Sequence, residues 1–260
     1  MHILILLTLH GLGNDNFLIY YPSGYKEEAL MVFNYLNYYK PHVDSLTGNN
    51  PKKTFVVIED IGLASNGFAD PTRYATHLFS NIPYPDFRFG TMRGWWREVS
   101  VHEYTHISHL TNVGGLISFL HRFFGRILIP NVMAPMAMIE GITVSTESSI
   151  VPYEGRLNEG YYDPYTTLLA SKNALPSFSY LYHIPENYPS YSLPYIIGGE
   201  FTRFLKGEDS IVPLINVAWE KHLKRENLRK YYTEYGKNIS QLINYDVAAI
   251  KVYKLSLIHI

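Results

Sequence analysis

The sequence predicts an α+β fold in which a small α/β lobe precedes a mainly α-helical lobe. Three observations support this. Apolar runs at 17–21, 54–58 and 73–79 are bounded by turn-forming residues, as strands are. Between the first two runs, residues 26–39 repeat apolar side chains at helical spacing. After residue 93 helical spacing dominates, so we place the α/β lobe at 13–92 and the helical lobe at 93–254 of one domain.

Within the first lobe, each predicted element ends at a recognisable signal. Pro22-Ser23-Gly24 ends the first strand, and Pro41 is expected to end the helix. Ser65-Asn66-Gly67 is typical of a turn before the third strand.

The second lobe is predicted to contain five helices and one long loop. Gly114-Gly115 ends the first helix, and Pro135 suits the first position of the third. The predicted helices span 94–111, 116–127, 135 to beyond 147, 195–206 and 210–220, and the Tyr-rich stretch 154–188 is expected to be mostly loop.

Composition narrows the classes of function. Of the 260 residues, 47% are hydrophobic and 17% charged, which is the balance of a globular protein. The formal net charge of −1 gives no indication of a nucleic-acid partner held by bulk charge. The chain has no cysteine, so any metal ion must be bound by His, Asp or Glu.

Both ends of the chain need separate treatment. Residues 1–12 are either the remnant of a signal peptide or a first strand, because the apolar run from Ile3 to Leu9 is too short to span a bilayer. An extracytoplasmic or secreted location is therefore expected, with a cytoplasmic one left open. Residues 255–260 resemble a translated sequencing adaptor, so we expect a non-native tail and a longer natural chain.

The segment 102–106 reads His-Glu-Tyr-Thr-His inside the first helix of the second lobe. His102 and His106 are four residues apart and so lie on one helix face, where two imidazoles can bind one metal ion. Glu103 follows the first histidine and is positioned to take a proton from metal-activated water. These three residues predict a hydrolytic metal site.

A catalytic zinc ion usually has a third protein ligand. Glu140 follows an apolar run, so we expect it to be buried, and a buried carboxylate requires a cation. Glu147 lies two turns further on and is either a hydrogen-bond acceptor for a ligand imidazole or an ordinary polar residue. His109 is the competing third ligand.

His-Glu-x-x-His followed by a helix with Glu140-Gly141 resembles the gluzincins, the clan of thermolysin and the M1 aminopeptidases. The long gap before Glu140 is more similar to the peptidase-MA-like domains, including those found N-terminal to WD40-like β-propellers. The resemblance implies a zincin-like fold with an edge strand over the cleft, one Zn²⁺ on His102, His106 and Glu140, and hydrolysis of peptide bonds. Peptide or protein substrates and a C-terminal propeller are the partners it implies.

The resemblance also assigns further roles. Tyr195-Ile-Ile-Gly198 is similar to the Tyr-x-x-Gly segment of M1-type enzymes, which implies that Tyr195 stabilises the oxyanion; Tyr182 and His183 are weaker alternatives. The strand from Tyr74 to Phe79 is expected at the edge of the sheet, where it pairs with extended substrate.

The sequence departs from the clan in two places. It lacks the Gly-x-Met-Glu-Asn exopeptidase motif, and Val144 occupies the position of thermolysin's acidic residue four places after the glutamate ligand. Two other functions remain open: a zinc hydrolase acting on a non-peptide bond, and a non-catalytic or structural-metal module that docks a partner or an adjoining propeller.

Overall fold

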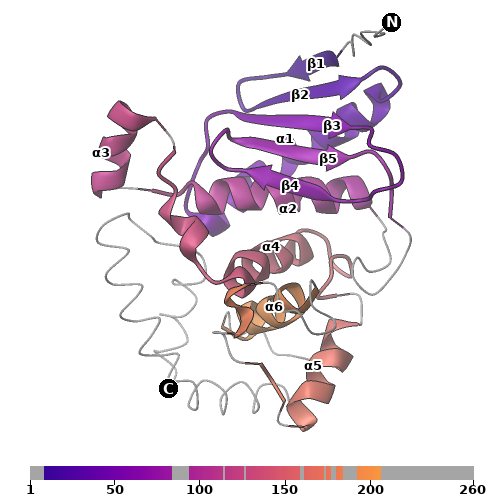
Figure 1. Cartoon of the computed structure of the whole chain (residues 1–260). Helices are drawn as coiled ribbons and strands as arrows, with labels where there is room; N and C mark the ends of the chain where they lie inside the picture. The colour runs from indigo at the N-terminus through magenta and orange to yellow at the C-terminus, as the bar shows by residue number, and fades with distance from the viewer. Residues whose placement is uncertain are drawn as a thin grey trace, which may run out of the picture.

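A computed structural model describes most of the first 205 residues of the chain. The described residues are 9–83, 94–113, 115–125, 127–158, 161–172, 174–176, 180–183 and 192–205. They form a five-stranded mixed sheet, helices that pack against this sheet, and further helices that lie beyond these (Figure 1). The mixed α/β composition confirms the predicted α+β class.

The sheet has the strand order β1-β2-β3-β5-β4. Its three inner strands are mutually parallel, and an antiparallel strand lies at each edge. The strands are β1 (Leu9–Gly13), β2 (Phe17–Pro22), β3 (Thr54–Glu59), β4 (Gly67–Asp70) and β5 (Ala75–Phe79).

The prediction that the strand ending at Phe79 lies at the edge of the sheet is wrong. β5 pairs with β3 on one side and with β4 on the other, so β4 forms this edge. β4 begins at Gly67, which the sequence pattern assigned to a turn. The Asp70 carboxylate accepts a hydrogen bond from the backbone N–H of Thr72 (3.1 Å), and Tyr74 adopts a left-handed φ of 53°. This turn folds β4 back along β5.

Helix α1 (Lys26–Thr47) runs past the predicted stop at Pro41. Proline removes one backbone donor from a helix interior, at a cost of about 3 kcal/mol or more. The buried stripe nevertheless continues beyond it through Val43 and Thr47, and the Thr47 hydroxyl lies 2.7 Å from the Ser108 hydroxyl. Packing beyond Pro41 therefore outweighs the local break, and Gly48 ends the helix in a left-handed conformation (φ 69°).

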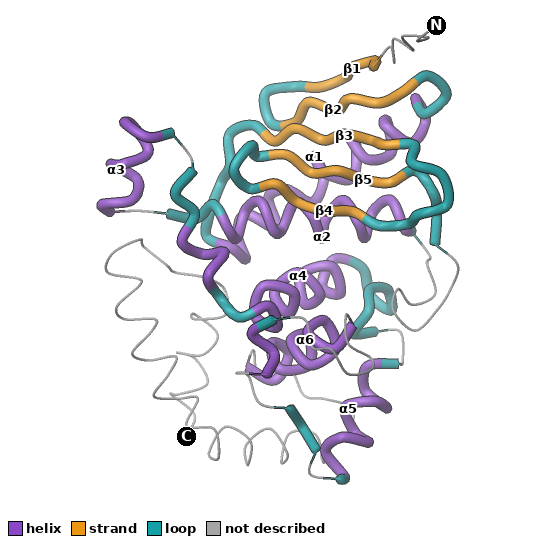
Figure 2. The backbone as a smooth tube through the Cα atoms, viewed as in Figure 1, coloured by secondary structure: helices purple, strands orange, loops and turns teal. Residues whose placement is uncertain are grey.

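One face of the sheet packs against α1 and against α2 (Trp95–Leu110), as Figure 2 shows. Alternate residues of β2 and β3 are buried while their neighbours are partly exposed, the pattern of a sheet covered on one face. Phe17, Ile19, Val56 and Ile58 form a core with apolar residues of both helices. This core fixes α2 directly beneath the sheet.

The remaining described helices form the second part of the molecule. They are α3 (Gly115–Phe124), α4 (Met136–Ile150), α5 (Tyr162–Ser171) and α6 (Leu193–Leu205), with short 3-10 helices at Pro130–Met133 and Tyr180–Tyr182. No helix in the described ranges combines the length and the apolar run that a bilayer span requires.

The predicted helices of this lobe that fall within the described residues are present, and one helix that was not predicted is present as well. Helix α5 lies inside the stretch predicted to be loop, and Pro164 sits in its first turn, where proline is tolerated. The predicted helix 210–220 lies outside the described residues.

Two glycines allow α4 and α6 to pack backbone against backbone. A Cβ placed on Gly141 of α4 would overlap the carbonyl group of Gly198 on α6. A Cβ on Gly198 would overlap the carbonyl oxygen of Ala137 in return. Gly141 directly follows Glu140, and Gly198 lies one turn after Tyr195, so this contact sets the distance between two predicted site residues.

We predict that Gly141→Ala and Gly198→Ala each lower the free energy of unfolding by about 1–3 kcal/mol, because the added methyl group meets backbone atoms that cannot rotate away. The gain in helix propensity of up to about 1 kcal/mol does not offset this overlap. Urea unfolding followed by circular dichroism measures the change. Gly11→Ala is the matched control, since a Cβ there meets no atom closer than 3.7 Å. Unchanged stability in both helix variants would contradict the close packing.

Candidate metal centre

The segment His102–His106 lies in the middle of α2, which is buried along nearly its whole length between the sheet and α4. Only 5% of His102 and 7% of His106 is exposed. The ring centroids are 4.8 Å apart, as expected for residues one helical turn apart on the same face. Two imidazoles this deeply buried require partners or a bound cation.

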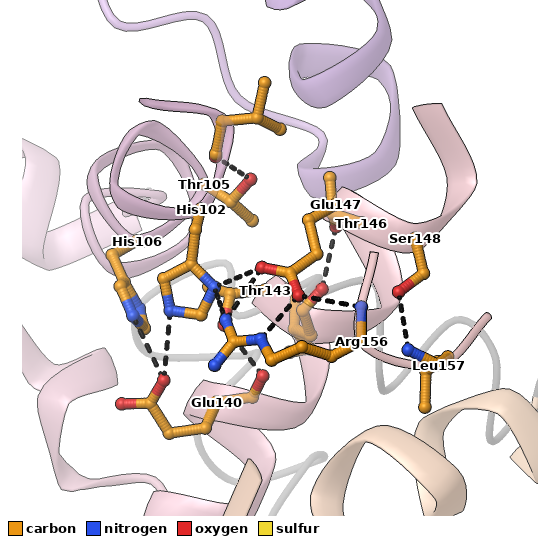
Figure 3. Close-up of polar contacts among 12 residues, drawn as sticks. His102, Thr105, His106, Glu140, Thr143, Thr146, Glu147, Ser148, Arg156 and Leu157 are labelled. Carbon is orange, nitrogen blue, oxygen red and sulfur yellow. Dashed lines mark hydrogen bonds and ion pairs between the residues drawn. The ribbon is translucent and has the colours of Figure 1, made fainter. Parts of the chain in front are cut away.

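Glu140 reaches the two histidines from α4. Its Oε2 atom lies 3.3 Å from Nε2 of His102 and 3.3 Å from Nε2 of His106 (Figure 3). The three side chains each offer a ligand atom, all within 4.8 Å of one another. Among the described residues, this is the group of His, Asp and Glu side chains that could hold a metal ion.

The donor set fits a metal ion. Glu140 Oε2 is buried and faces Nε2 of both imidazoles at 3.3 Å, and His106 Nδ1 is buried without a hydrogen-bond partner. Two imidazole nitrogens and one carboxylate oxygen, without a thiolate, match the three protein ligands of many catalytic zinc sites. Such a set leaves a coordination position for water or substrate.

The electrostatics of the cluster favour a positive charge at its centre. Burial lowers the pKa of His102, as does the Arg156 charge, but hydrogen bonds with Glu140 and Glu147 raise it to about 9. Burial raises the pKa of Glu140, but the charge of His106 and hydrogen bonds from both imidazoles hold it well below its usual range. The carboxylate is therefore ionised, and a proton or a metal cation can balance it.

Glu147 is the acceptor that orients His102. Its Oε2 lies 2.8 Å from His102 Nδ1, on the far side of the ring from Glu140. Burial raises the pKa of Glu147, but the charge and hydrogen bonds of Arg156 lower it to about 2, so the group is a carboxylate. An Nδ1–H that donates to Glu147 leaves Nε2 free for a metal ion. Of the two interpretations left open for Glu147, this geometry supports the acceptor.

Arg156 holds the Glu147 carboxylate in place and was not predicted from the sequence. Its Nε donates to Glu147 Oε1 (2.6 Å) and its Nη2 to Oε2 (2.7 Å). Nη2 also lies 2.7 Å from His102 Nδ1, but an Nδ1 that donates to Glu147 cannot accept a hydrogen bond from Arg156. We therefore assign Arg156 as the partner of Glu147.

A turn after α4 brings Arg156 back to the site. Tyr153 (φ 66°) and Gly155 (φ 84°) both adopt left-handed conformations and reverse the chain. The Leu157 backbone N–H then donates to the Ser148 hydroxyl (3.1 Å), which fixes the returning segment on the last turns of α4 (Figure 3). Apart from the glycine, no local sequence pattern marks an arginine that acts nine residues after its partner.

Glu103 lines a pocket next to the two histidines. The side chain is buried, and this burial raises its pKa above that of an ordinary glutamate, although the charges of His102 and His106 oppose the shift. The pocket is lined by residues of the β4 edge, of α2, of the α4 region and of α6: Ser65, Asn66, Gly67, Trp95, Glu98, Val99, His102, Glu103, Glu147, Arg156, Ser192 and Tyr195.

The edge strand β4 lies directly against Glu103. A Cβ placed on Gly67 would come within 3.0 Å of Glu103 Oε1 and within 2.8 Å of Val99 Cγ2. Only glycine lets the strand approach α2 so closely. The glycine that the sequence pattern assigned to a turn therefore brings the edge strand of the described sheet to the pocket.

Tyr195 also lines the pocket, from the first turn of α6. Its ring is stacked on that of His102, with centroids 6.0 Å apart, and the Arg156 guanidinium lies 5.0 Å from its centroid. Of the two alternatives for its role, His183 is exposed and does not line this pocket, and the side chain of Tyr182 lies outside the described residues.

The competing ligand His109 does not join the cluster. It is fully buried, and neither of its ring nitrogens has a hydrogen-bond partner. Burial and the neighbouring His106 charge lower its pKa to about 3, so the ring is neutral. It is not part of the group formed by His102, His106 and Glu140.

Comparisons with models of protein families, with curated proteins and with solved structures find no match for this chain. The function of this chain is therefore inferred from the geometry of the site itself.

We predict that Glu140→Ala weakens zinc binding by at least about 100-fold, because it removes one of three ligands and leaves a vacancy between two imidazoles. His109→Ala should leave the zinc affinity within about threefold of the original chain. Competition with a chelating dye gives both dissociation constants, and circular dichroism confirms that each variant is folded. The reverse order of effects would replace Glu140 by His109 in the ligand set.

Proposed function

We propose that this chain is a zinc-dependent peptidase of the gluzincin type. The observation that carries the proposal is the convergence of His102, His106 and Glu140 at one buried point, with Glu103 beside them in an accessible pocket. A structural metal site needs no glutamate between the histidines and no pocket next to it. A zinc hydrolase needs a general base and a pocket beside the metal ion, since water must be deprotonated where the substrate binds.

Zinc held by these three side chains would polarise the scissile carbonyl and lower the pKa of water towards about 7. Glu103 is the general base: it accepts the proton of the attacking water and then delivers it to the leaving amine. Its raised pKa suits this role because the protonated form is then accessible nearer neutral pH. Since the base must start ionised, hydrolysis should fall when the Glu103 carboxylate is protonated at low pH.

Tyr195 is proposed to donate a hydrogen bond to the oxyanion that develops on the substrate carbonyl. It lines the same pocket as Glu103, and its ring lies near the ring of His102 and the Arg156 guanidinium. A positive guanidinium near a phenol favours the donation of its O–H to an anion. Arg156 would thus serve both Glu147 and Tyr195.

The edge of β4 supports a peptide as the substrate. Its outer backbone groups have no strand partner among the described residues, and Gly67 of this strand lies against Glu103. An extended peptide can add to such an edge through main-chain hydrogen bonds, which give affinity with little sequence preference. This role replaces the one expected for the strand ending at Phe79, and it agrees with a zincin-like arrangement of the sheet over the active-site helix.

We expect Glu103→Gln to retain zinc and to lose nearly all hydrolysis of casein. The amide keeps the shape of the side chain but cannot accept a proton at neutral pH, and loss of a general base typically costs about 10²–10⁴-fold in rate. Metal analysis and a casein assay on the same preparation measure the two properties, with a chelator-treated sample as the blank. Zinc binding without cleavage of casein by the unchanged chain would instead support a non-peptide substrate or a non-catalytic module.

Tyr195→Phe should lower kcat by a factor on the order of 10²–10³ with little change in KM or zinc content, because one oxyanion donor acts mainly in the transition state. Tyr165→Phe is the matched control, since Tyr165 is partly buried against the core that contains α6 but does not line the pocket. Full activity of Tyr195→Phe together with an inactive Tyr182→Phe would show that the role belongs to Tyr182.

A further inference from the structure

Helix α3 presents an apolar face to solvent rather than to the core. At about 100° per residue its apolar side chains cover an arc of about 160°, and the opposite arc carries polar residues and a glycine. The apolar arc consists of Leu116, Ile117, Phe119, Leu120, Phe123 and Phe124, and the polar arc of Gly115, Ser118, His121 and Arg122.

Most of the apolar arc is exposed. The exposed fractions are 56% for Leu116, 52% for Phe119, 68% for Phe123 and 62% for Phe124. The patch continues along the chain, where Ile127 and Met133 are also exposed. Figure 1 shows α3 at the side of the molecule, standing away from the sheet and from α4. Exposed apolar surface of this kind normally marks a site of interaction.

The charged side chains in this part of the sequence are all positive. No Asp or Glu occurs between Glu103 and Glu140, whereas the same stretch contains Arg122 and Arg126. Arg122 lies on the polar arc of α3, beside His121, whose Nε2 lies 2.7 Å from the carbonyl oxygen of Leu128. A protein partner that covered only the phenylalanines would not require this absence of acidic residues. The absence of carboxylates from α3 favours an anionic lipid surface, since carboxylates would be repelled by the headgroups.

We propose that α3 is an interfacial anchor that inserts its apolar arc into the surface of an anionic lipid bilayer, with Arg122 at the level of the headgroups. Phenylalanine and leucine on one face and arginine on the other are the features of helices that lie in the membrane interface. The inference is independent of the peptidase proposal, because α3 contributes no residue to the metal cluster or to the pocket. It would hold this part of the chain at a membrane surface.

Cosedimentation of the whole chain with vesicles tests the anchor. The chain should pellet with phosphatidylcholine vesicles that contain about one-fifth phosphatidylserine and more weakly with pure phosphatidylcholine. Raising NaCl from about 0.1 M to about 1 M should weaken binding to the anionic vesicles only. The double variant Phe119→Ser, Phe123→Ser should bind at least about tenfold more weakly to both kinds of vesicle.

Two controls keep the test specific. Tyr38→Ser removes an equally exposed aromatic side chain from α1 (77% exposed) and should bind vesicles as the unchanged chain does. Arg122→Glu keeps the apolar arc and should weaken binding to anionic vesicles alone. Absence of vesicle binding by the unchanged chain would overturn the anchor. So would a concentration-dependent dimer that the Phe119→Ser, Phe123→Ser variant dissolves, since a second copy would then cover this face.

Discussion

The structure depends on how it compensates the charges buried between α2 and α4. His102, His106, Glu140 and Glu147 all lie away from water, where an isolated charge is very costly. Glu147 is balanced by Arg156 and by the Nδ1–H of His102. Among the described residues, the Glu140 carboxylate faces two imidazole nitrogens, and the three side chains together could hold a cation.

This centre lies where two apolar cores meet. One core packs α2 against the sheet, and the other packs α4 against α6. The histidines and Glu103 are thus fixed by the first core, and Glu140 and Tyr195 by the second. The close contact of Gly141 with Gly198 sets the spacing within the second core. The two glycines that accompany Glu140 and Tyr195 in the sequence are therefore explained by packing rather than by chemistry.

The sequence predicts the site better than it predicts the sheet. The positions of His102, Glu103 and His106 follow from helical spacing, which is local, and Glu140 follows from its apolar surroundings. The edge role of β4 could not be predicted, because strand order depends on pairings between distant residues and Gly67 has the local signature of a turn. The expectation that the helix ends at Pro41 is wrong because Thr47 packs against α2, and no local sequence pattern reveals this contact.

Arg156 marks a further limit of sequence reasoning. Val144 occupies the position of thermolysin's acidic residue, and Glu147, one turn further along α4, contacts His102 Nδ1 instead. Its pairing with Arg156 depends on a left-handed turn at Tyr153 and Gly155, which no periodicity reveals. The sequence also does not reveal that the apolar arc of α3 is exposed, because an amphipathic pattern is the same whether its apolar face points inward or outward.

The most direct test of the account is anomalous X-ray scattering at the zinc absorption edge from crystals grown with zinc. We predict one strong peak about 2.0–2.2 Å from Nε2 of His102, Nε2 of His106 and a carboxylate oxygen of Glu140. A zinc peak at the two histidines that Glu140 does not reach, or no peak between these three side chains, would contradict it.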